Sequence, residues 1–242
     1  MKIWGISDLH LSFASNKPMD IFGDHWCNHA EKMAEYWDRL ISHEDIVLVP
    51  GDLSWAMKLQ DARLDLDWIA KRPGLKILVK GNHDLWWGSI GKVRAFIGKS
   101  CIALQNDSYD IGEFVVAGSR CWSAPGSFDY TQHDEKIYQR ELQRLKISLE
   151  HACSLAPNKP IIAAIHYPPF TMKKENTAFA DLLEQYPVKI CVYGHLHTQK
   201  SFQYAFEGMR NNILYMMLSC DYLHFKPRLI WPLLQSDEVA YA

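Results

Sequence analysis

The sequence lacks any long apolar segment. Its longest apolar runs have the length of a β-strand, whereas a helix that crosses a bilayer needs about 20 apolar residues. The opening residues, MKIWGISDLH, reach Asp8 before the apolar core of a secretion signal could be complete. These absences predict a cytoplasmic protein without membrane partners.

Paired cysteines and an excess of positive charge are also missing. The six cysteines are scattered without a CxxC pair, which argues against a disulfide framework or a thiolate zinc site. We expect buried, reduced thiols that pack as small apolar side chains. The formal net charge is −2, so no global basic field attracts nucleic acid, although the composition leaves room for a local basic groove. Nucleic acid is therefore not an expected partner.

Internal repeats, low-complexity tracts and linkers are absent as well. At 242 residues, with 48% hydrophobic and 22% charged residues, the chain has an ordinary globular composition and can bury a large core. We predict a single domain over residues 1–242, and the sequence leaves its oligomeric state open.

Apolar patterns with strand and helix character alternate along the chain. Helical spacing of apolar residues predicts helices over 28–43, 58–72, about 134–154 and 176–185. Short apolar runs predict strands at KIWGIS, DIVLVP, LKILVK, CIALQ, a hairpin around Gly112, IIAAIHY, VKICVYG, FQYAF, ILYMMLS and RLIW. This order predicts a layered α/β sandwich. In open α/β sheets ligands bind beyond the carboxyl ends of strands, so functional residues should follow the apolar runs.

Five of these apolar runs end in residue types that bind metals. The residues that follow them are Asp8 and His10, Asp52, the segment Asn82-His83-Asp84, His166, and the pair His195 and His197. Without partners, such buried carboxylates and imidazoles would each cost several kcal/mol. A pair of divalent cations would compensate that cost, and the mixture of imidazole, carboxylate and amide oxygen suits Mn²⁺, Fe or Zn²⁺. One such motif alone has a plain structural explanation, but five together predict a metal site.

The ordered motifs DLH, GD, GNHD, a lone histidine after a strand, and GHLH resemble those of the calcineurin-like metallophosphoesterase superfamily. They run from Asp8 to His197, and the segments KPMDIFG and GDLSWAMKL are similar to a bacterial group of predicted phosphohydrolases. The resemblance implies a four-layer α/β sandwich of two mixed β-sheets flanked by helices. It also implies two divalent metal ions and hydrolysis of a small phosphomonoester or phosphodiester by attack of a metal-bound hydroxide.

The resemblance also implies roles for individual residues. The implied ligands are Asp8, His10 and His197 for one ion, Asn82, His166 and His195 for the other, and Asp52 as a bridge. His83 would face the leaving oxygen, and Asp84 would orient its ring. Glycines before Asp52, Asn82 and His195 would permit the sharp turns that bring these ligands together.

Candidate substrate contacts lie on the loops that leave the same strand ends. Trp55, Trp86 and Trp87 could stack on a base or sugar of a substrate. The alternative is that these rings pack inside and hold the loops rigid. Arg120, at the start of the predicted loop 120–131, is a candidate phosphate contact, and the alternative is an ordinary surface arginine.

Two alternatives to a phosphoesterase of small substrates stay open. GNHD with GHLH also resembles nucleolytic members of the superfamily, but the capping domain and basic surface that these usually carry have little room in this chain. A non-catalytic binding scaffold would typically lack a motif histidine, and both motifs are intact here. Assays on an aryl phosphate, an aryl phosphodiester and single-stranded DNA, with metal analysis, would distinguish the three.

Overall fold

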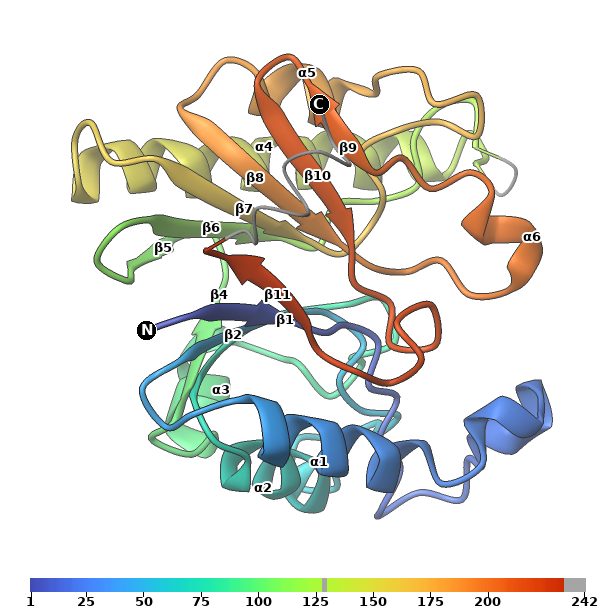
Figure 1. The fold of residues 1–242 in the computed structure, drawn as a ribbon. Coiled ribbons are helices and arrows are strands. Elements are labelled where there is room, and N and C mark those ends of the chain that lie inside the picture. The colour runs from blue at the N-terminus through green and yellow to red at the C-terminus, as the bar shows by residue number, and fades with distance from the viewer. Residues whose placement is uncertain (128–129, 233–242) are drawn as a thin grey trace.

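Two mixed β-sheets, packed face to face, form the centre of the computed structural model, which describes residues 1–127 and 130–232 (Figure 1). The first sheet contains, in spatial order, β11 (Arg228–Trp231), β1 (Ile3–Gly5), β2 (Ile46–Pro50), β3 (Leu75–Val79) and β4 (Cys101–Leu104). The second contains β5 (Ser108–Asp110), β6 (Val115–Ser119), β7 (Ile161–Ile165), β8 (Val188–Tyr193), β10 (Ile213–Met217) and β9 (Gly208–Arg210). Strands β11, β5 and β9 pair antiparallel with their neighbours, and all other neighbouring strands, including the edge strand β4, pair in parallel.

Helices cover the outer face of each sheet (Figure 1). The helices against the first sheet are α1 (His29–Leu40), α2 (Arg63–Lys71) and α3 (Ile90–Phe96). Those on the side of the second sheet are α4 (Asp134–Leu155), α5 (Ala178–Leu183) and the short α6 (Gln199–Phe202). Two 3-10 turns, η1 (Met19–Phe22) and η2 (Asp24–Trp26), precede α1. The predicted sandwich of two mixed sheets flanked by helices is therefore confirmed.

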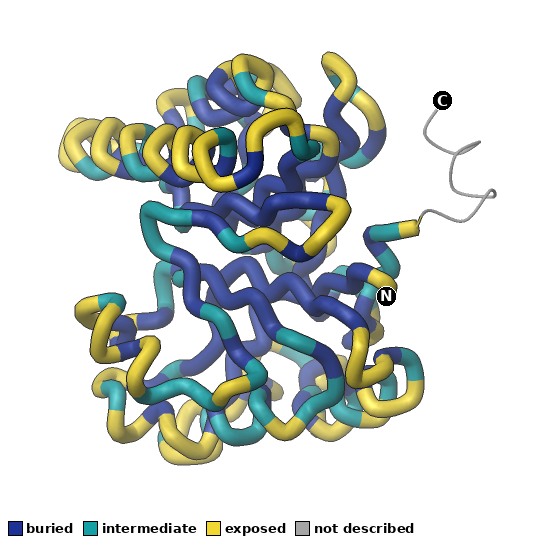
Figure 2. The backbone as a smooth tube through the Cα atoms, turned by 90° about the vertical axis from the view of Figure 1, so that its left-hand side faces the viewer, coloured by how far each residue is buried: buried dark blue, intermediate teal, exposed yellow. Residues whose placement is uncertain are grey.

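The helices are amphipathic, and the sheets are buried on both faces. Helix α1 turns Ala30, Met33 and Trp37 inward, which is the spacing of one helical face. All five residues of β2 and of β7 are buried, as expected for parallel strands with a layer on each side. Figure 2 shows the same distribution, with buried strands inside and exposure on the outer sides of the helices. In the described part of the chain, no helix is long and apolar enough to span a membrane.

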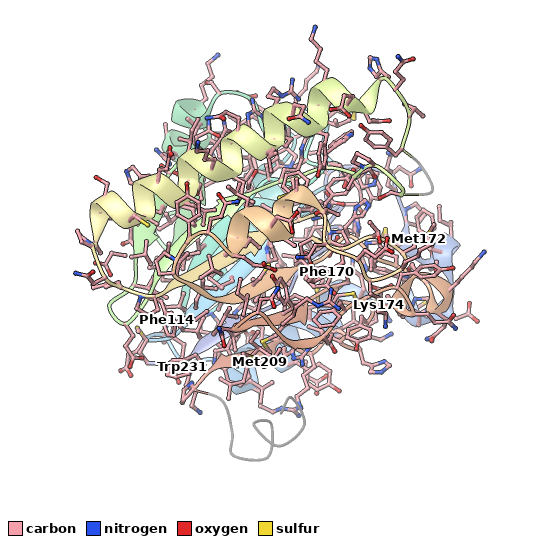
Figure 3. All side chains as sticks on the ribbon, turned by 90° about the horizontal axis from the view of Figure 1, so that it is seen from above. Phe114, Phe170, Met172, Lys174, Met209 and Trp231 are labelled. Carbon is pink, nitrogen blue, oxygen red and sulfur yellow. The ribbon has the colours of Figure 1, made fainter. Side chains whose placement is uncertain are left out.

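The two sheets share one apolar layer. Residues such as Leu48 of β2 and Val192 of β8, both fully buried, belong to the same core cluster. At one end of this layer the rings of Phe114 and Trp231, labelled in Figure 3, pack edge to face with centroids 5.3 Å apart. This packing joins the entry to β6 with the end of β11. Because the sheets pack on each other, loops from both can meet at one edge.

The structure differs from the sequence-based expectation in several elements, among them β9, η1 and η2, which were not predicted. Helix α3 was not predicted, because Gly91 in its first turn weakens the helical pattern. Helix α2 begins at Arg63 rather than at residue 58. The segment FQYAF was predicted as a strand but forms the end of α6 and a turn. There Phe202 and Phe206 pack against the apolar core that the second sheet forms with α4 and α5. Alternating aromatic residues suggested a strand there, but tertiary packing accommodates them in a turn.

The cysteines follow the expectation with one exception. All six are free, and Cys101, Cys121, Cys191 and Cys220 are buried. Cys153 is half-buried, but Cys27 is exposed, so the expectation of a buried thiol was wrong there. Cys27 lies between η2 and α1, outside the periodic apolar runs on which the expectation depended.

Candidate metal centre

The carboxyl ends of β1, β2, β3, β7 and β8 meet at one edge of the sandwich, and the seven predicted metal ligands follow these ends. Parallel strands place such ends side by side. As a result, His10 and His197 come into contact although they are 187 positions apart in the sequence. Asp8, His10 and His197 have potential ligand atoms within 4.8 Å of one another, and so do Asp8, Asp52 and His166.

The first group surrounds Asp8, which is fully buried. Nε2 of His197 lies 3.3 Å from Oδ1 of Asp8. The same nitrogen lies 3.3 Å from Nε2 of His10. The backbone N–H of His195 donates to both oxygens of Asp8 at 3.1 Å, which holds the carboxylate in place. Three side chains with metal-ligand chemistry therefore converge at one point.

The second group surrounds the side-chain oxygen of Asn82. Oδ1 of Asn82 lies 2.7 Å from Nε2 of His166 and 3.1 Å from Nδ1 of His195. An amide oxygen and two imidazole nitrogens again form a compact set of donor atoms.

Asp52 lies between the two groups. Its Oδ2 is 3.4 Å from Nε2 of His166 and 3.9 Å from Nε2 of His10. Its Oδ1 accepts a hydrogen bond of 2.8 Å from the backbone N–H of His83, so Oδ2 is the oxygen that faces both histidines. This position between the groups is the one that the motifs predicted for a bridging residue.

Backbone strain accompanies this convergence. Positive φ angles, rare for residues other than glycine, occur at Asp8 (60°), His10 (46°), Asp52 (53°) and His195 (74°). Such strain persists only where surrounding structure enforces it, and it concentrates at functional sites. Two glycines allow the close approach, since a Cβ at Gly81 would collide with Asp52 and one at Gly194 would collide with Asp8.

Hydrogen bonds fix the orientation of two histidines. Nδ1 of His166 donates to the carbonyl oxygen of Pro50 at 3.0 Å, which directs Nε2 toward Asn82 and Asp52. Nδ1 of His197 lies 2.9 Å from Oδ1 of Asp221, which directs Nε2 toward Asp8. A partner of this kind sets the tautomer of a metal-binding histidine and raises its basicity.

Asp221 was missed by the sequence analysis. It follows the apolar run ILYMMLS by one residue, so it carried the same strand-end signal as the predicted ligands. The motifs shared with the family end at His197, and Asp221 lies beyond the last of them.

The donor set fits divalent cations. Nδ1 of His166 and Nδ1 of His197 are engaged as donors. In these tautomers, the Nε2 lone pairs of both rings face the lone pairs of carboxylate and amide oxygens of the other proposed ligands. Such an arrangement is repulsive unless protons or cations lie between the atoms. The set contains imidazole, carboxylate and amide oxygen without thiolate, which suits Mn²⁺, Fe or Zn²⁺.

The pKa values of the proposed histidine ligands also indicate that the buried carboxylates favour positive charge at this site. Burial lowers the pKa of His166, but the carboxylate of Asp52 outweighs it and raises this pKa to about 9. For His197, burial is likewise outweighed by Asp8, and the pKa rises to about 10. Burial lowers the pKa of His10 and of His195 to about 3, so both imidazoles are neutral and able to bind a metal.

His83 lies at the margin of the cluster. Its ring centroid is 4.4 Å from the ring of Trp55 and 5.7 Å from that of His10. Burial lowers the pKa of His83, so the imidazole is neutral near pH 7 and can donate one N–H hydrogen bond. Its place beside the ligands, without belonging to either group, agrees with the predicted role at the leaving oxygen, which stays a prediction.

Asp84 does not make the predicted contact with the ring of His83. Its carboxylate accepts hydrogen bonds from the backbone N–H groups of Leu53, Ser54 and Gly81 and from Nε1 of Trp86, at 2.8–3.1 Å. In the described chain, no hydrogen bond joins it to the His83 imidazole. Asp84 instead ties the loop after β3 to the loop after β2. It therefore positions Asn82 and Asp52 relative to each other through the backbone.

The predicted substrate contacts are placed differently by the structure. Trp86 and Trp87 are 3% and 2% exposed and belong to the apolar core that the first sheet forms with its helices. They therefore anchor the loop after β3 in this core and are not accessible for stacking on a substrate. Trp55 is half-buried and stacks on His10 with centroids 4.9 Å apart. Arg120 donates to Glu141 at 2.8 Å and lies over the ring of Trp122. A substrate contact stays a prediction for Trp55 and Arg120 only.

A pocket of about 620 Å³ opens beside His195 and His197. Aromatic and apolar side chains form much of its wall, including Trp122, Tyr167 and Phe170. The ring of Tyr167, which also lines the pocket, lies 3.9 Å from that of His195. Residues 128–129 of the predicted loop 120–131 lie outside the described residues.

Comparisons with known proteins agree with this geometry. A family model described as calcineurin-like phosphoesterase matches residues 1–199. The gene 66 protein of Mycobacterium phage D29 is 39% identical over 84 residues, and that of Mycobacterium phage L5 is 33% identical over 81 residues. These alignments cover 34% of this chain and 40% and 39% of the phage proteins. The chain thus spans about two fifths of the length of these relatives.

Solved structures share the fold at low sequence identity. Phosphopantetheinyl hydrolase from Mycobacterium tuberculosis superposes with a TM-score of 0.56 at 16% identity, covering 97% of both chains. The protein AQ665 of unknown function from Aquifex aeolicus superposes with a TM-score of 0.50 at 13% identity, covering 99% of this chain and 97% of that one. At such identities the similarity shows the fold alone. Because the family model matches residues 1–199 of 242, the chain belongs to the calcineurin-like phosphoesterase family of metal-dependent hydrolases, as the motifs predicted.

Proposed function

We propose that this protein is a dinuclear metal-dependent phosphohydrolase that cleaves a small phosphomonoester or phosphodiester. The observation that carries the proposal is the convergence of two sets of donor atoms with Asp52 between them. The proposed ligands are Asp8, His10 and His197 for one ion, Asn82, His166 and His195 for the other, and Asp52 for both. When bound, a pair of divalent cations binds phosphoryl oxygens and lowers the pKa of water toward neutrality.

The residues of the chain itself contribute orientation and a proton donor. Asp221 and the carbonyl group of Pro50 hold the imidazoles of His197 and His166 in the ligating orientation. The backbone N–H of His83 holds Asp52, and the ring of His83 lies beside the cluster, where it can donate to the departing oxygen. Such a positioned donor contributes about 10²–10⁴-fold in rate.

The pocket beside His195 supports an organic phosphate ester as substrate. Its aromatic wall suits an ester whose alcohol is largely apolar, since pockets of this kind bind chiefly by burying apolar surface. Phe170 and Met172, labelled in Figure 3, come from the segment between β7 and α5 and contribute to this wall. The alcohol would lie in this pocket while the phosphoryl group faces the ligands.

The test combines metal analysis with hydrolysis assays. The metal-free protein would be loaded separately with Mn²⁺, Fe²⁺ and Zn²⁺ and assayed on an aryl phosphate, an aryl phosphodiester, a phosphopantetheinyl ester and single-stranded DNA. We expect about two metal ions per chain and metal-dependent hydrolysis of a small ester. His166→Ala should abolish turnover, whereas His43→Ala, at an exposed position, should not. Absence of hydrolysis in the loaded protein would refute the proposal, and faster cleavage of DNA than of small diesters would favour a nuclease.

A further inference from the structure

A second pocket, of about 240 Å³, lies at the carboxyl ends of β3, β4 and β6 and is closed by α4. Its lining shares no residue with the proposed metal ligands or with the pocket beside His195. We call it the basic pocket, after the side chains of Lys80, Arg120, Arg140 and Arg144 in its wall. Figure 1 shows α4 lying along the outer side of the second sheet, where it brings two of these arginines to the end of β6.

The positive charge in the basic pocket is only partly compensated. Glu141 is the one acidic residue in its lining, and it is 1% exposed. Its Oε1 pairs with Arg120 and Arg144 at 2.8 Å and with Arg140 at 3.5 Å. One carboxylate therefore serves three guanidinium groups, and Lys80 adds a fourth cation. Lys80 Nζ also donates to the carbonyl oxygen of Trp87 at 3.0 Å, and the surplus of positive charge favours binding of an anion.

The wall of the basic pocket also contains a buried hydrogen-bond donor without a partner among the described residues. Nε of Arg120 is buried and has no hydrogen-bond partner in the described part of the chain. Each guanidinium group carries five N–H donors, of which a shared carboxylate oxygen can satisfy few. The side-chain oxygen of Gln105 accepts from Nε1 of Trp87 at 3.0 Å, which leaves its NH₂ group as another donor in the wall. Convergent donors and surplus positive charge are the chemistry of an oxyanion site.

We propose that the basic pocket binds a compact phosphoryl oxyanion, at a site separate from the metal centre. Arginine side chains bind phosphate oxygens with paired N–H groups, and three of them surround this pocket. A volume of about 240 Å³ is smaller than that of most pockets for drug-sized ligands, so the ligand is compact. The source of the phosphoryl group is either free phosphate or the end of an organic phosphate.

Short backbone connections link the basic pocket to the proposed metal centre. Lys80 directly precedes Gly81 and Asn82, and Arg120 accepts through its carbonyl oxygen from the N–H of Tyr167, next to His166. Two residues of the basic pocket, Lys80 and Arg120, are therefore close along the backbone to the proposed ligands Asn82 and His166. This proximity is independent of which reaction the metal centre performs.

The test is titration calorimetry of the full-length, metal-loaded protein with inorganic phosphate at low salt. The variant Arg140→Gln/Arg144→Gln removes two cations at half-exposed or exposed positions of α4, while the pair of Arg120 and Glu141 stays intact. We expect this variant to lose one bound phosphate per chain relative to the unchanged protein, or to bind it at least about tenfold more weakly. The control Arg39→Gln/Lys146→Gln removes the same net charge from exposed ion pairs elsewhere and should retain this phosphate.

Equal stoichiometry and affinity in the double variant and in the control would overturn the proposal. A thermal melt of each variant verifies that it is folded. Phenylphosphonate in place of phosphate distinguishes the source, because only a pocket that accepts organic phosphates would bind both. The readout is the difference between variants, so a metal centre that fails to hydrolyse any ester leaves this result unaffected.

Discussion

The carboxylate oxygen Oδ1 of Asp221 lies 2.9 Å from Nδ1 of His197, on the side of the imidazole opposite to Asp8. Asp221 is 7% exposed, so little water competes for this contact. The pair extends the proposed metal centre to a residue beyond its five motifs.

Asp221→Asn should weaken binding of the ion held by His197 by about 10–100-fold, because the histidine loses the partner that sets its tautomer and basicity. Competition with a metal-sensitive chelator measures the affinity. Asp20→Asn, at an exposed position, is the matched control and should bind as before. An unchanged affinity in Asp221→Asn would show that the contact is only structural.

His83→Asn should keep both ions and lose about 10²–10⁴-fold in kcat, since His83 lies outside both groups of donor atoms. The loss should be larger for an alkyl ester than for an aryl ester, because a good leaving group needs less help from a proton donor. Elemental analysis and steady-state kinetics measure the two effects, with the exposed His133→Asn as control. Normal turnover of the alkyl ester would remove His83 from the mechanism.

Gly194→Ala should damage the centre through sterics alone. A Cβ at Gly194 would collide with the side chains of Asp8 and Ser7, and overpacking of this kind costs about 1–3 kcal/mol. We expect lower stability in chemical denaturation and weaker metal binding. Gly91→Ala in α3 meets no atom within 4 Å and should be neutral or slightly stabilising. Equal effects of the two substitutions would contradict the steric argument.

Asp65 should make stability depend on pH. It is 1% exposed and accepts from the N–H of Phe13 at 2.9 Å and from the hydroxyl group of Ser54, so it ties the loops after β1 and β2 together. Burial raises the pKa of Asp65 above its ordinary value of 3.8. Above pH 3.8 the folded protein therefore retains a proton on Asp65 that the unfolded chain has released. The contribution of Asp65 to the free energy of unfolding consequently decreases as the pH rises above 3.8.

Replacement by asparagine removes this proton equilibrium. The stability of Asp65→Asn relative to the unchanged protein should consequently increase as the pH is raised from about 4 to 7. Denaturation curves at several pH values measure the difference. The control is Asp67→Asn, at a half-exposed ion pair on the same helix, whose relative stability should vary little. A difference for Asp65→Asn that does not vary with pH would show that its pKa is not raised.

Much of the fold and of the proposed metal centre was predictable from local patterns. Buried parallel strands appear as short apolar runs, and a functional residue placed at the end of such a run is visible without its neighbours. The positions of Asp8, Asp52 and His166 are examples. Helix α3 escaped because Gly91 interrupts its pattern, and the FQYAF segment was assigned to a strand because alternation alone does not reveal a turn.

The partners of polar groups were not predictable in the same way. Asp84 follows Asn82 and His83 in one motif, yet two of its hydrogen bonds reach Leu53 and Ser54 in the loop after β2. The other two come from Gly81 and the indole of Trp86 rather than from the imidazole. The burial of Trp86 and Trp87 was not predictable either, because the neighbouring Leu85 is 58% exposed and spacing along the chain does not distinguish the three residues.

By itself, the sequence determined the alternation of elements, the family and the set of residues able to bind metals, because these depend on residue types and on spacing along the chain. Only the tertiary structure decided that Asp221 supports His197, that Asp84 braces loops, and that Arg120 pairs with Glu141 of α4. These relationships join residues from different strands and helices, and their distances exist only after the two sheets have packed together.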